Sequence, residues 1–304
     1  MKFKDLDMGI REIMDVLLLD VVERETKNGK SYTVLTVTDG EQTIDVKKWD
    51  SVLTDYENLK NTVVTLNIKS SMYGSDLTYD TDIITKSHKP VSDFIPKVPL
   101  DSTQMMNDIM ARIQQMQDNK LRKLVEMVFN DHQSELMYWA AAKGMHHALY
   151  GGLLYHIYRM GMNADAQCNI YPELNRDLLV AGAYLHDIGK LAELNTSTLG
   201  TAEYTTTGSL VGHAYLGMHM LEDYGKKCDV PQNTVLQLQH MVASHHGNLE
   251  WGAVTVPQTM EAQMLHYLDM IDSRMYMYED TYKVLEPGKP SNKIFGLGTS
   301  VFKF

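Results

Sequence analysis

An adjacent histidine and aspartate, His186-Asp187, open the motif HDIGK at residues 186–190. A neutral imidazole and a carboxylate are both ligands for transition-metal ions, and the two oxygens of one carboxylate can bridge two ions. Lys190 lies one helical turn beyond Asp187, so its ammonium group would face the same site. A lone His-Asp pair is common, and its interpretation as a metal site therefore depends on further ligands.

Further residues of the same chemical types lie on both sides of this motif. They are His156 upstream, and His213, His245, His246 and Asp269 downstream. Any one of these histidines alone is usually a structural or surface residue, but the set supplies enough ligands for one or two ions.

We predict that one ion is held by His156, His186, Asp187 and Asp269. A second ion would share Asp187 and add His213, His245 and His246. Two alternatives stay open, namely a mononuclear site and a hydrogen-bonded Asp-His pair without metal. The set contains no thiolate, so it suits Mn, Fe, Co, Ni or Zn better than Ca.

Such a site is suited to phosphoester hydrolysis. Two ions about 3.5–4 Å apart would clamp a phosphate and lower the pKa of a bridging water, which would attack phosphorus. Lys190 would stabilise negative charge on the non-bridging oxygens. His147, which precedes the Gly151-Gly152 pair, is the candidate acid for the leaving group.

The segments that carry these residues have helical spacing of apolar side chains from Ser102 onward, and Ser102 is the expected first cap. We expect helices over 102–117, 121–143, 150–162, 175–190, 205–225, 235–247 and 259–278. The segment 175–190 is apolar nearly all round, so it should be the buried central helix. Burial of His186 and Asp187 there would be costly without a cation.

Three other polar residues of these helices receive separate interpretations. Asp272 shares a helix face with Asp269, and we expect it to support the site or to face solvent. We expect His219 to point away from the site and His240 to be structural.

The first part of the chain is typical of strands. Alternating segments at 13–26, 31–38, 43–49, 63–73 and 77–85 are separated by turn signals such as Asn28-Gly29 and Asp39-Gly40. Residues 50–60 are expected to form one short helix, capped by Asp50 or Ser51. Three strands, a helix and two strands is the order of a five-stranded OB-type barrel.

Barrels of this type often bind single-stranded nucleic acid through stacking aromatic side chains. Tyr32, Trp49, Tyr73 and Tyr79 are the candidates for stacking. The alternative is that they belong to the barrel core or are scattered over its surface. The excess of acidic over basic residues in this part gives no support to nucleic-acid binding.

The length of 304 residues suits about two domains. We predict an α+β multidomain protein, with an OB-like barrel over 1–88, a Pro-rich linker over 89–101, an all-α metal-binding helical bundle over 102–285 and a tail over 286–304. The tail could cover an edge or join a partner chain, and a homo-oligomer remains open.

Composition restricts the class of protein. The net charge of −11 argues against a broad non-specific nucleic-acid surface, although bound divalent ions would supply local positive charge. No apolar run is long enough for a membrane helix, and the N-terminus has no signal-peptide pattern. The two cysteines, Cys168 and Cys228, form no CxxC motif, so we expect a reducing, cytoplasmic setting.

Five motifs in order resemble a known family across nearly the whole chain. They are HHALYGGLLYH (146–156), GAYLHDIGKLAEL (182–194), GSLVGHAYLG (208–217), HMVASHHG (240–247) and MEAQMLHYLDMID (260–272). The ligand set is similar to the signature of the HD-superfamily metal-dependent phosphohydrolases, and the five motifs resemble the YhaM-type 3′→5′ exoribonucleases, which join an OB-type domain to an HD domain.

The resemblance implies a manganese-preferring or cobalt-using enzyme. It would remove nucleotides from the 3′ end of single-stranded RNA, and of DNA as a further substrate, and release nucleoside 5′-monophosphates. The metal roles would fall on the seven ligands named above, with Lys190 at the phosphate. The chain departs from the family pattern at Trp139, Tyr155 and Ala253, and none of these changes removes a ligand.

Two other functions are compatible with the same residues. One is an HD phosphohydrolase of small nucleotides, such as cyclic nucleotides or nucleoside phosphates. The other is a non-catalytic RNA-binding protein in which the metal site is structural. The exonuclease should degrade a polymer, the small-nucleotide hydrolase should turn over only small nucleotides, and the RNA-binding protein should turn over neither.

Overall fold

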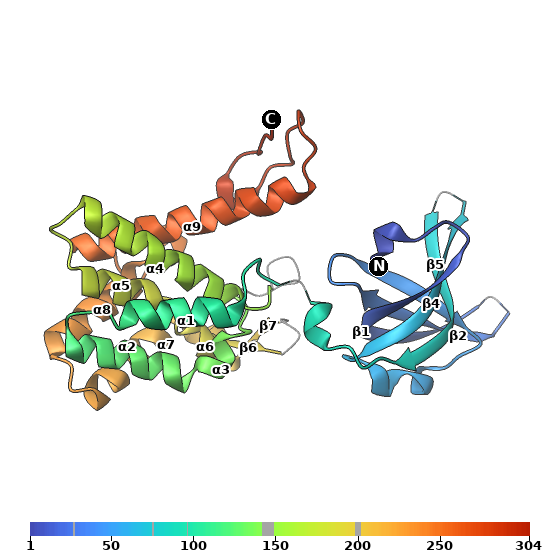
Figure 1. Ribbon diagram of the computed structural model, residues 1–304, viewed down its shortest axis with the longest axis horizontal. Coiled ribbons are helices and arrows are strands. Elements are labelled where there is room, and N and C mark those ends of the chain that lie inside the picture. The colour runs from blue at the N-terminus through green and yellow to red at the C-terminus, as the bar shows by residue number, and fades with distance from the viewer. Residues whose placement is uncertain (27, 75, 96, 142–148, 198–201) are drawn as a thin grey trace. The chain divides into compact units, whose positions relative to one another are not determined.

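The computed structural model describes residues 1–26, 28–74, 76–95, 97–141, 149–197 and 202–304. The described residues form two compact units, one over Met1–Lys97 and one that begins at Val98. The first is built of strands and the second mainly of helices (Figure 1), so the predicted α+β architecture is confirmed. No helix of the described residues is long and apolar enough to cross a membrane.

The first unit is a closed five-stranded barrel. Its strands are β1 (Arg11–Glu25), β2 (Ser31–Thr38), β3 (Thr43–Trp49), β4 (Val63–Tyr73) and β5 (Asp76–Lys86). They follow the order β1-β2-β3-β5-β4, in which β3 and β5 pair in parallel and all other neighbours are antiparallel. This is the strand order of the OB-type Greek-key barrel that the sequence predicts.

Apolar side chains at alternate positions of the strands fill the interior of the barrel. On β4, Val64, Leu66 and Ile68 are fully buried, and they pack with apolar residues of β1, β2 and β3. The Asp39-Gly40 turn closes the hairpin between β2 and β3, where Gly40 adopts a φ of 87°. The buried carboxylate of Asp39 accepts hydrogen bonds from the backbone N–H groups of Glu41 and Gln42 and from that of Phe3 in the N-terminal segment, which fixes the hairpin.

The prediction of one helix over 50–60 is wrong. The segment forms two separate 3-10 turns, Leu53–Asp55 and Glu57–Leu59. Asp50 adopts a φ of 50°, and the hydroxyl of Ser51 donates to the carbonyl of Lys48 and lies 2.8 Å from the hydroxyl of Thr33. Because Ser51 is tied back to the barrel, it cannot cap a helix.

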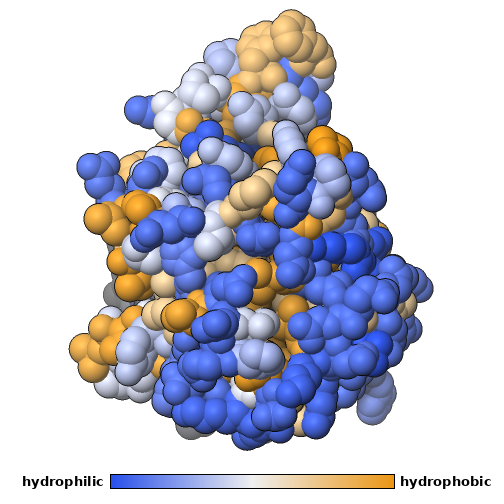
Figure 2. Space-filling model, turned by 90° about the vertical axis from the view of Figure 1, so that its left-hand side faces the viewer, coloured by the Kyte–Doolittle hydropathy of each residue, from blue (hydrophilic) through white to orange (hydrophobic). Residues whose placement is uncertain are grey.

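The second unit packs its helices around α5. The helices are α1 (Ser102–Ile113), α2 (Asn119–Asp131), α3 (Gln133–Leu136), α4 (Gly152–Ile170), α5 (Arg176–Leu185), α6 (Lys190–Glu193), α7 (Thr206–Lys227), α8 (Gln232–Ser244) and α9 (Met260–Val284), and a short ribbon pairs β6 (Leu194–Thr196) with β7 (Ala202–Tyr204). Every residue of 177–185 is buried, so α5 is the central helix that the apolar pattern predicts. By contrast, the outer face seen in Figure 2 is largely hydrophilic, with apolar residues in small groups.

Several helix boundaries differ from the predicted ones. The first N-cap is Asp101 rather than Ser102, because the Asp101 carboxylate accepts from the backbone of Gln104. The helix predicted over 121–143 ends at Asp131, and α3 follows as a separate short helix. The helix predicted to end before Gly225 runs through it. A Cβ at Gly225 would lie 2.5 Å from a methyl carbon of Val235, so this glycine permits a close contact with α8.

The C-terminal segment folds back beside the end of α9 (Figure 1). The hydroxyl of Tyr282 donates to the carbonyl of Phe302, and the side chain of Val301 is buried. A 3-10 turn over Phe295–Leu297 lies against α9, where a Cβ at Gly296 would be 2.5 Å from the methyl carbon of Met277. The tail therefore supports α9.

Truncation of a barrel core side chain tests this architecture. Replacement of the fully buried Leu66 by alanine should lower the free energy of unfolding of the barrel by about 2–5 kcal/mol, because it removes buried methyl groups and leaves a cavity. Hydrogen exchange of β1 and β4 amides measures this local stability. Leu77→Ala, at a side chain that is 48% exposed on β5, is the matched control and should change it by less than about 0.5 kcal/mol.

Candidate functional site

The turn that follows α5 carries His186 and Asp187 into the interior of the helical unit. The helix predicted over 175–190 is interrupted here: α5 ends at Leu185, and α6 begins at Lys190. His186 is fully buried and Asp187 is 3% exposed. The other predicted ligands reach the same place from α4, α7, the end of α8 and α9.

One group of side chains faces the Oδ2 atom of Asp187. The Nε2 atoms of His156 and His186 lie 3.1 Å apart, and they are 3.7 and 3.5 Å from this oxygen. Asp269 joins them, since its Oδ1 lies 3.5 Å from Nε2 of His156. These four residues are the predicted first ion site, and three of them form a group with metal-ligand spacing.

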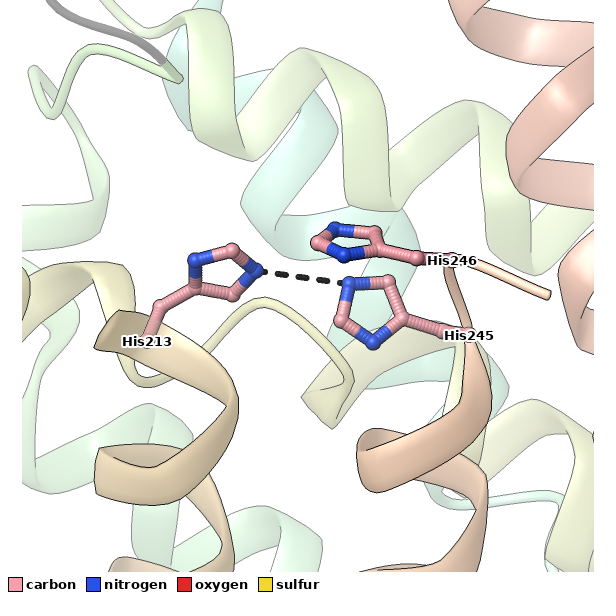
Figure 3. A group of neighbouring side chains, drawn as sticks. All are labelled: His213, His245 and His246. Atoms are coloured by element: carbon pink, nitrogen blue, oxygen red, sulfur yellow. Dashed lines mark hydrogen bonds between the residues drawn. The ribbon is translucent and has the colours of Figure 1, made fainter. Parts of the chain in front are cut away.

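A second group faces the other oxygen of the same carboxylate. Nε2 of His213 lies 3.5 Å and Nε2 of His245 lies 3.8 Å from Oδ1 of Asp187. Figure 3 shows His213 facing His245 and His246 across this space, with 3.4 Å between the Nε2 atoms of His213 and His245. These three histidines also have metal-ligand spacing. The Oδ1 atom is buried and has no hydrogen-bond partner among the described residues.

In four of these histidines, His156, His186, His213 and His245, the other ring nitrogen contacts a protein oxygen. Nδ1 of His186 lies 3.1 Å from the carbonyl of Ala183, and Nδ1 of His245 lies 2.6 Å from the carbonyl of Val242. A carbonyl only accepts, so both Nδ1 atoms must carry the proton and both Nε2 atoms must present a lone pair.

Carboxylates hold the remaining two imidazoles in the same way. Nδ1 of His156 lies 2.7 Å from Oδ2 of Asp272, and Nδ1 of His213 lies 3.1 Å from Oε1 of Glu193. In the neutral rings, all four Nε2 lone pairs then point at Asp187 and at one another. A cation between them removes the repulsion, and this orientation by outer carboxylates and carbonyls is the usual arrangement around metal-bound histidines. The donor set therefore fits divalent metal ions.

The charge states of the predicted ligands favour the binding of cations. Burial lowers the pKa of His186 and His246, and it lowers the pKa of His245 further, so these rings are neutral ligands near pH 7. Burial alone would raise the pKa of Asp187, but Lys190 and the surrounding imidazoles outweigh it and hold that pKa well below its usual value. Asp187 is therefore an anion in this interior.

His156 differs from the other buried imidazoles. Burial opposes its protonation, but the hydrogen bond to Asp272 and the charges of Asp269 and Asp187 prevail and raise its pKa. A proton on His156 partly balances the surrounding carboxylates when no metal is bound, and a metal ion would take its place.

Lys190 lies beside the cluster rather than within it. Its Nζ lies 2.7 Å from Oδ2 of Asp187, as the predicted spacing requires. Its backbone carbonyl accepts a hydrogen bond from the indole N–H of Trp139, one of the departures from the family pattern. His147, the predicted leaving-group acid, lies outside the described residues.

Glycines allow the ligand-bearing segments to meet. A Cβ at Gly189 would lie 2.0 Å from the carbonyl oxygen of His213, so the turn after Asp187 can approach α7 only with glycine at this position. Gly212 adopts a φ of 71° and kinks α7 immediately before His213. Glu193 accepts hydrogen bonds from both the backbone N–H and the ring of His213. The kink and this carboxylate together aim His213 at Asp187.

The sequence did not reveal the outer residues of the site with the same clarity. Asp272 was expected either to support the site or to face solvent; it is 4% exposed and bridges His156 to Nε of Arg159, at 2.6 Å. The role of Arg159 was not predicted, although its position one turn after His156 was a signal. Glu193 was also missed, because nothing in its spacing distinguishes it from a surface carboxylate.

On the barrel, the predicted stacking residues have different surroundings. Tyr32 and Trp49 are direct neighbours on β2 and β3, with ring centroids 4.9 Å apart, and Lys47 places its Nζ 5.8 Å from the Trp49 ring. Tyr73 is 82% exposed at the end of β4. Tyr79 instead packs against the apolar core of the barrel, which leaves less of its ring for stacking.

Comparison with known proteins identifies part of the chain. Residues 153–274 match the family model described as HD domain. The helical unit is thus similar to HD domains, which bind divalent metals, and the matched segment includes all seven predicted ligands. Among solved structures, the chain is similar to the second OB-fold domain of replication protein A from Methanococcus maripaludis, with 19% identity, 30% of this chain and 96% of that chain covered, and a TM-score of 0.25.

Metal content tests the two groups of ligands. After loading with Mn²⁺ and removal of free ions, the wild-type protein should hold two ions per chain. His156→Ala and His213→Ala should each lose one, because each removes a ligand from a different oxygen of Asp187. His219→Ala is the control on α7, since this side chain is 70% exposed. Elemental analysis of the purified variants measures the manganese content per chain. Equal manganese content in His213→Ala and His219→Ala would contradict a second ion site.

Proposed function

We propose that this chain is a metal-dependent 3′→5′ exonuclease that hydrolyses single-stranded RNA, and single-stranded DNA as a further substrate, to nucleoside 5′-monophosphates. Mn²⁺ is the preferred ion, and Co²⁺, Fe²⁺, Ni²⁺ or Zn²⁺ are the alternatives. The observation that carries the proposal is the convergence of four imidazoles with fixed tautomers on both oxygens of Asp187. The five motifs shared with the YhaM-type exoribonucleases support the choice of a polymer substrate.

The residues of the helical unit have distinct tasks in this reaction. His156, His186 and Asp269 would hold one ion, His213, His245 and His246 the other, and Asp187 would contact both. Bound divalent ions supply charge that polarises the phosphate and lowers the pKa of an attacking water. Lys190 carries a positive charge at the edge of the site, because the attraction of Asp187 outweighs burial and raises its pKa. It would contact the non-bridging phosphate oxygens.

The barrel would hold the strand that is being degraded. The pair formed by Tyr32 and Trp49 lies on the face of β2 and β3, where OB-type barrels bind oligonucleotides, and the exposed Tyr73 lies at the β4–β5 loop. Base stacking tolerates any sequence, since every base has an aromatic face. Lys47 beside Trp49 supplies a positive charge for the backbone in an otherwise acidic chain.

Hydrolysis of small nucleotides by the same centre is the second candidate function. The cavity next to the ligands has a volume of about 320 Å³, which suits one nucleotide. The two functions differ in their need for the barrel, because only a polymer offers further bases for the stacking face in addition to a phosphate for the metal centre.

Removal of the bridging charge should abolish turnover. With Mn²⁺ and a single-stranded RNA labelled at its 5′ end, wild type should release 5′-mononucleotides from the 3′ end. Asp187→Asn should lower the rate by more than about 100-fold, since even the outer partners of metal ligands contribute about 10–100-fold. Chromatography of the products measures both rate and polarity, with His219→Ala as the control. Unchanged activity in Asp187→Asn would disprove the assignment.

Loss of the stacking ring should separate the two candidate functions. Trp49→Ala should weaken binding of single-stranded RNA by roughly 5- to 150-fold, while Trp49→Phe, which keeps a ring, should retain most of the affinity. Fluorescence anisotropy with labelled RNA measures the dissociation constants. Hydrolysis of a small nucleotide should be equal in both variants. RNA affinity that does not change in Trp49→Ala would remove this face from the proposal.

A further inference from the structure

The cavity beside the metal ligands extends well beyond them. Its lining includes His156, Asp187 and Lys190, and also the side chains of Tyr155, Tyr276 and Met277. None of the last three is a predicted metal ligand. An aromatic and apolar wall that continues directly from a phosphate-binding centre indicates a site for the rest of the substrate.

Two side chains of this wall, Tyr155 and Met277, are held in place by other parts of the helical unit. The guanidinium of Arg159 lies 5.2 Å from the centre of the Tyr155 ring and donates to its hydroxyl at 3.1 Å. Tyr276 lies about two helical turns beyond Asp269 on α9, so both residues present their side chains to the same cavity. Met277 is backed by the C-terminal segment at Gly296. The wall is therefore preformed, and its order costs little when a ligand binds.

Tyr276 has no structural task that would account for its position. Its hydroxyl makes no hydrogen bond to another described residue, and its ring contacts no other aromatic ring among them. Burial raises its pKa to about 12, so the ring is neutral. A neutral, half-buried ring with an open face in a cavity is suited to stacking on a flat ligand.

We propose that Tyr276, with Tyr155, forms the subsite for the base of a single terminal nucleotide, whose 5′-phosphate lies at Asp187 and Lys190. This inference rests on the proposed function. The cavity of about 320 Å³ is at the small end of the range for small-molecule sites, so it suits one nucleotide unit. When the base of the terminal nucleotide is bound against this wall, the phosphate that joins it to the rest of the strand lies at the metal ligands, so cleavage removes one nucleotide from the end.

Binding of two phosphates that differ only in the base tests the subsite. We expect Mn²⁺-loaded wild type to bind adenosine 5′-monophosphate roughly 5- to 150-fold more tightly than ribose 5-phosphate, as measured by isothermal titration calorimetry. Tyr276→Ala should bring the two affinities together by weakening only the nucleotide. Tyr276→Phe should preserve the difference, because the ring and not the hydroxyl makes the contact.

Controls exclude an indirect effect. Metal content and melting temperature of Tyr276→Ala should equal those of wild type, and Tyr276→Leu, which keeps apolar bulk, replaces it if the alanine variant does not fold. Equal affinity of wild type for the two phosphates, or a preference that survives in the alanine and leucine variants, would overturn the subsite.

The outcome for the subsite is separate from that for the exonuclease. Calorimetry needs no turnover, so a base preference that depends on Tyr276 supports the subsite even if RNA is not degraded. If RNA is degraded to mononucleotides but adenosine 5′-monophosphate and ribose 5-phosphate bind equally, the subsite fails and the exonuclease stands.

Discussion

The carboxylate of Asp187 is the group on which the helical unit depends. It is an anion buried almost completely, with imidazoles against both of its oxygens and one ammonium group at its edge. Burial of such a charge is unfavourable unless opposite charge compensates it. Arg159 pairs with Asp272, which leaves Lys190 beside Asp187 and Asp269. The cluster is thus a place where the protein requires cations.

The supporting elements serve this one requirement. The turn after α5 delivers Asp187, and the glycine at 189 lets that turn touch α7. The kink at Gly212 turns His213 inward, and Glu193 fixes both its backbone and its ring. On the opposite side, Arg159 anchors Asp272, which in turn fixes His156. His156 and His213 are thus each oriented by a carboxylate outside the predicted ligand set.

The sequence predicted those features that depend on residue type and local period. The barrel's strand order followed from alternation and turn residues, and the buried central helix followed from an apolar segment around 175–185. The set of imidazoles and carboxylates around Asp187 could be assembled from types and spacing alone. Long-range contacts decided the rest. The hydroxyl of Ser51 is hydrogen-bonded to Thr33 on β2, and this contact replaces the helix cap expected at the start of 50–60. Gly225 faces Val235 of α8, and this close contact lets α7 continue past the glycine. The pairing of Asp272 with Arg159 likewise depends on the packing of α4 against α9, which no local pattern reveals.

The fixed tautomers have a consequence for how the protein takes up ions. Since Nδ1 of His156, His186, His213 and His245 already contacts a carbonyl or carboxylate, these four rings need not reorganise when an ion arrives, and the entropy of arranging them is lost when the chain folds. Without an ion, the Nε2 atoms of His213 and His245 face each other at 3.4 Å where the ends of α5 and α8 meet α7. An ion bound there would complete the polar interior of an otherwise apolar core.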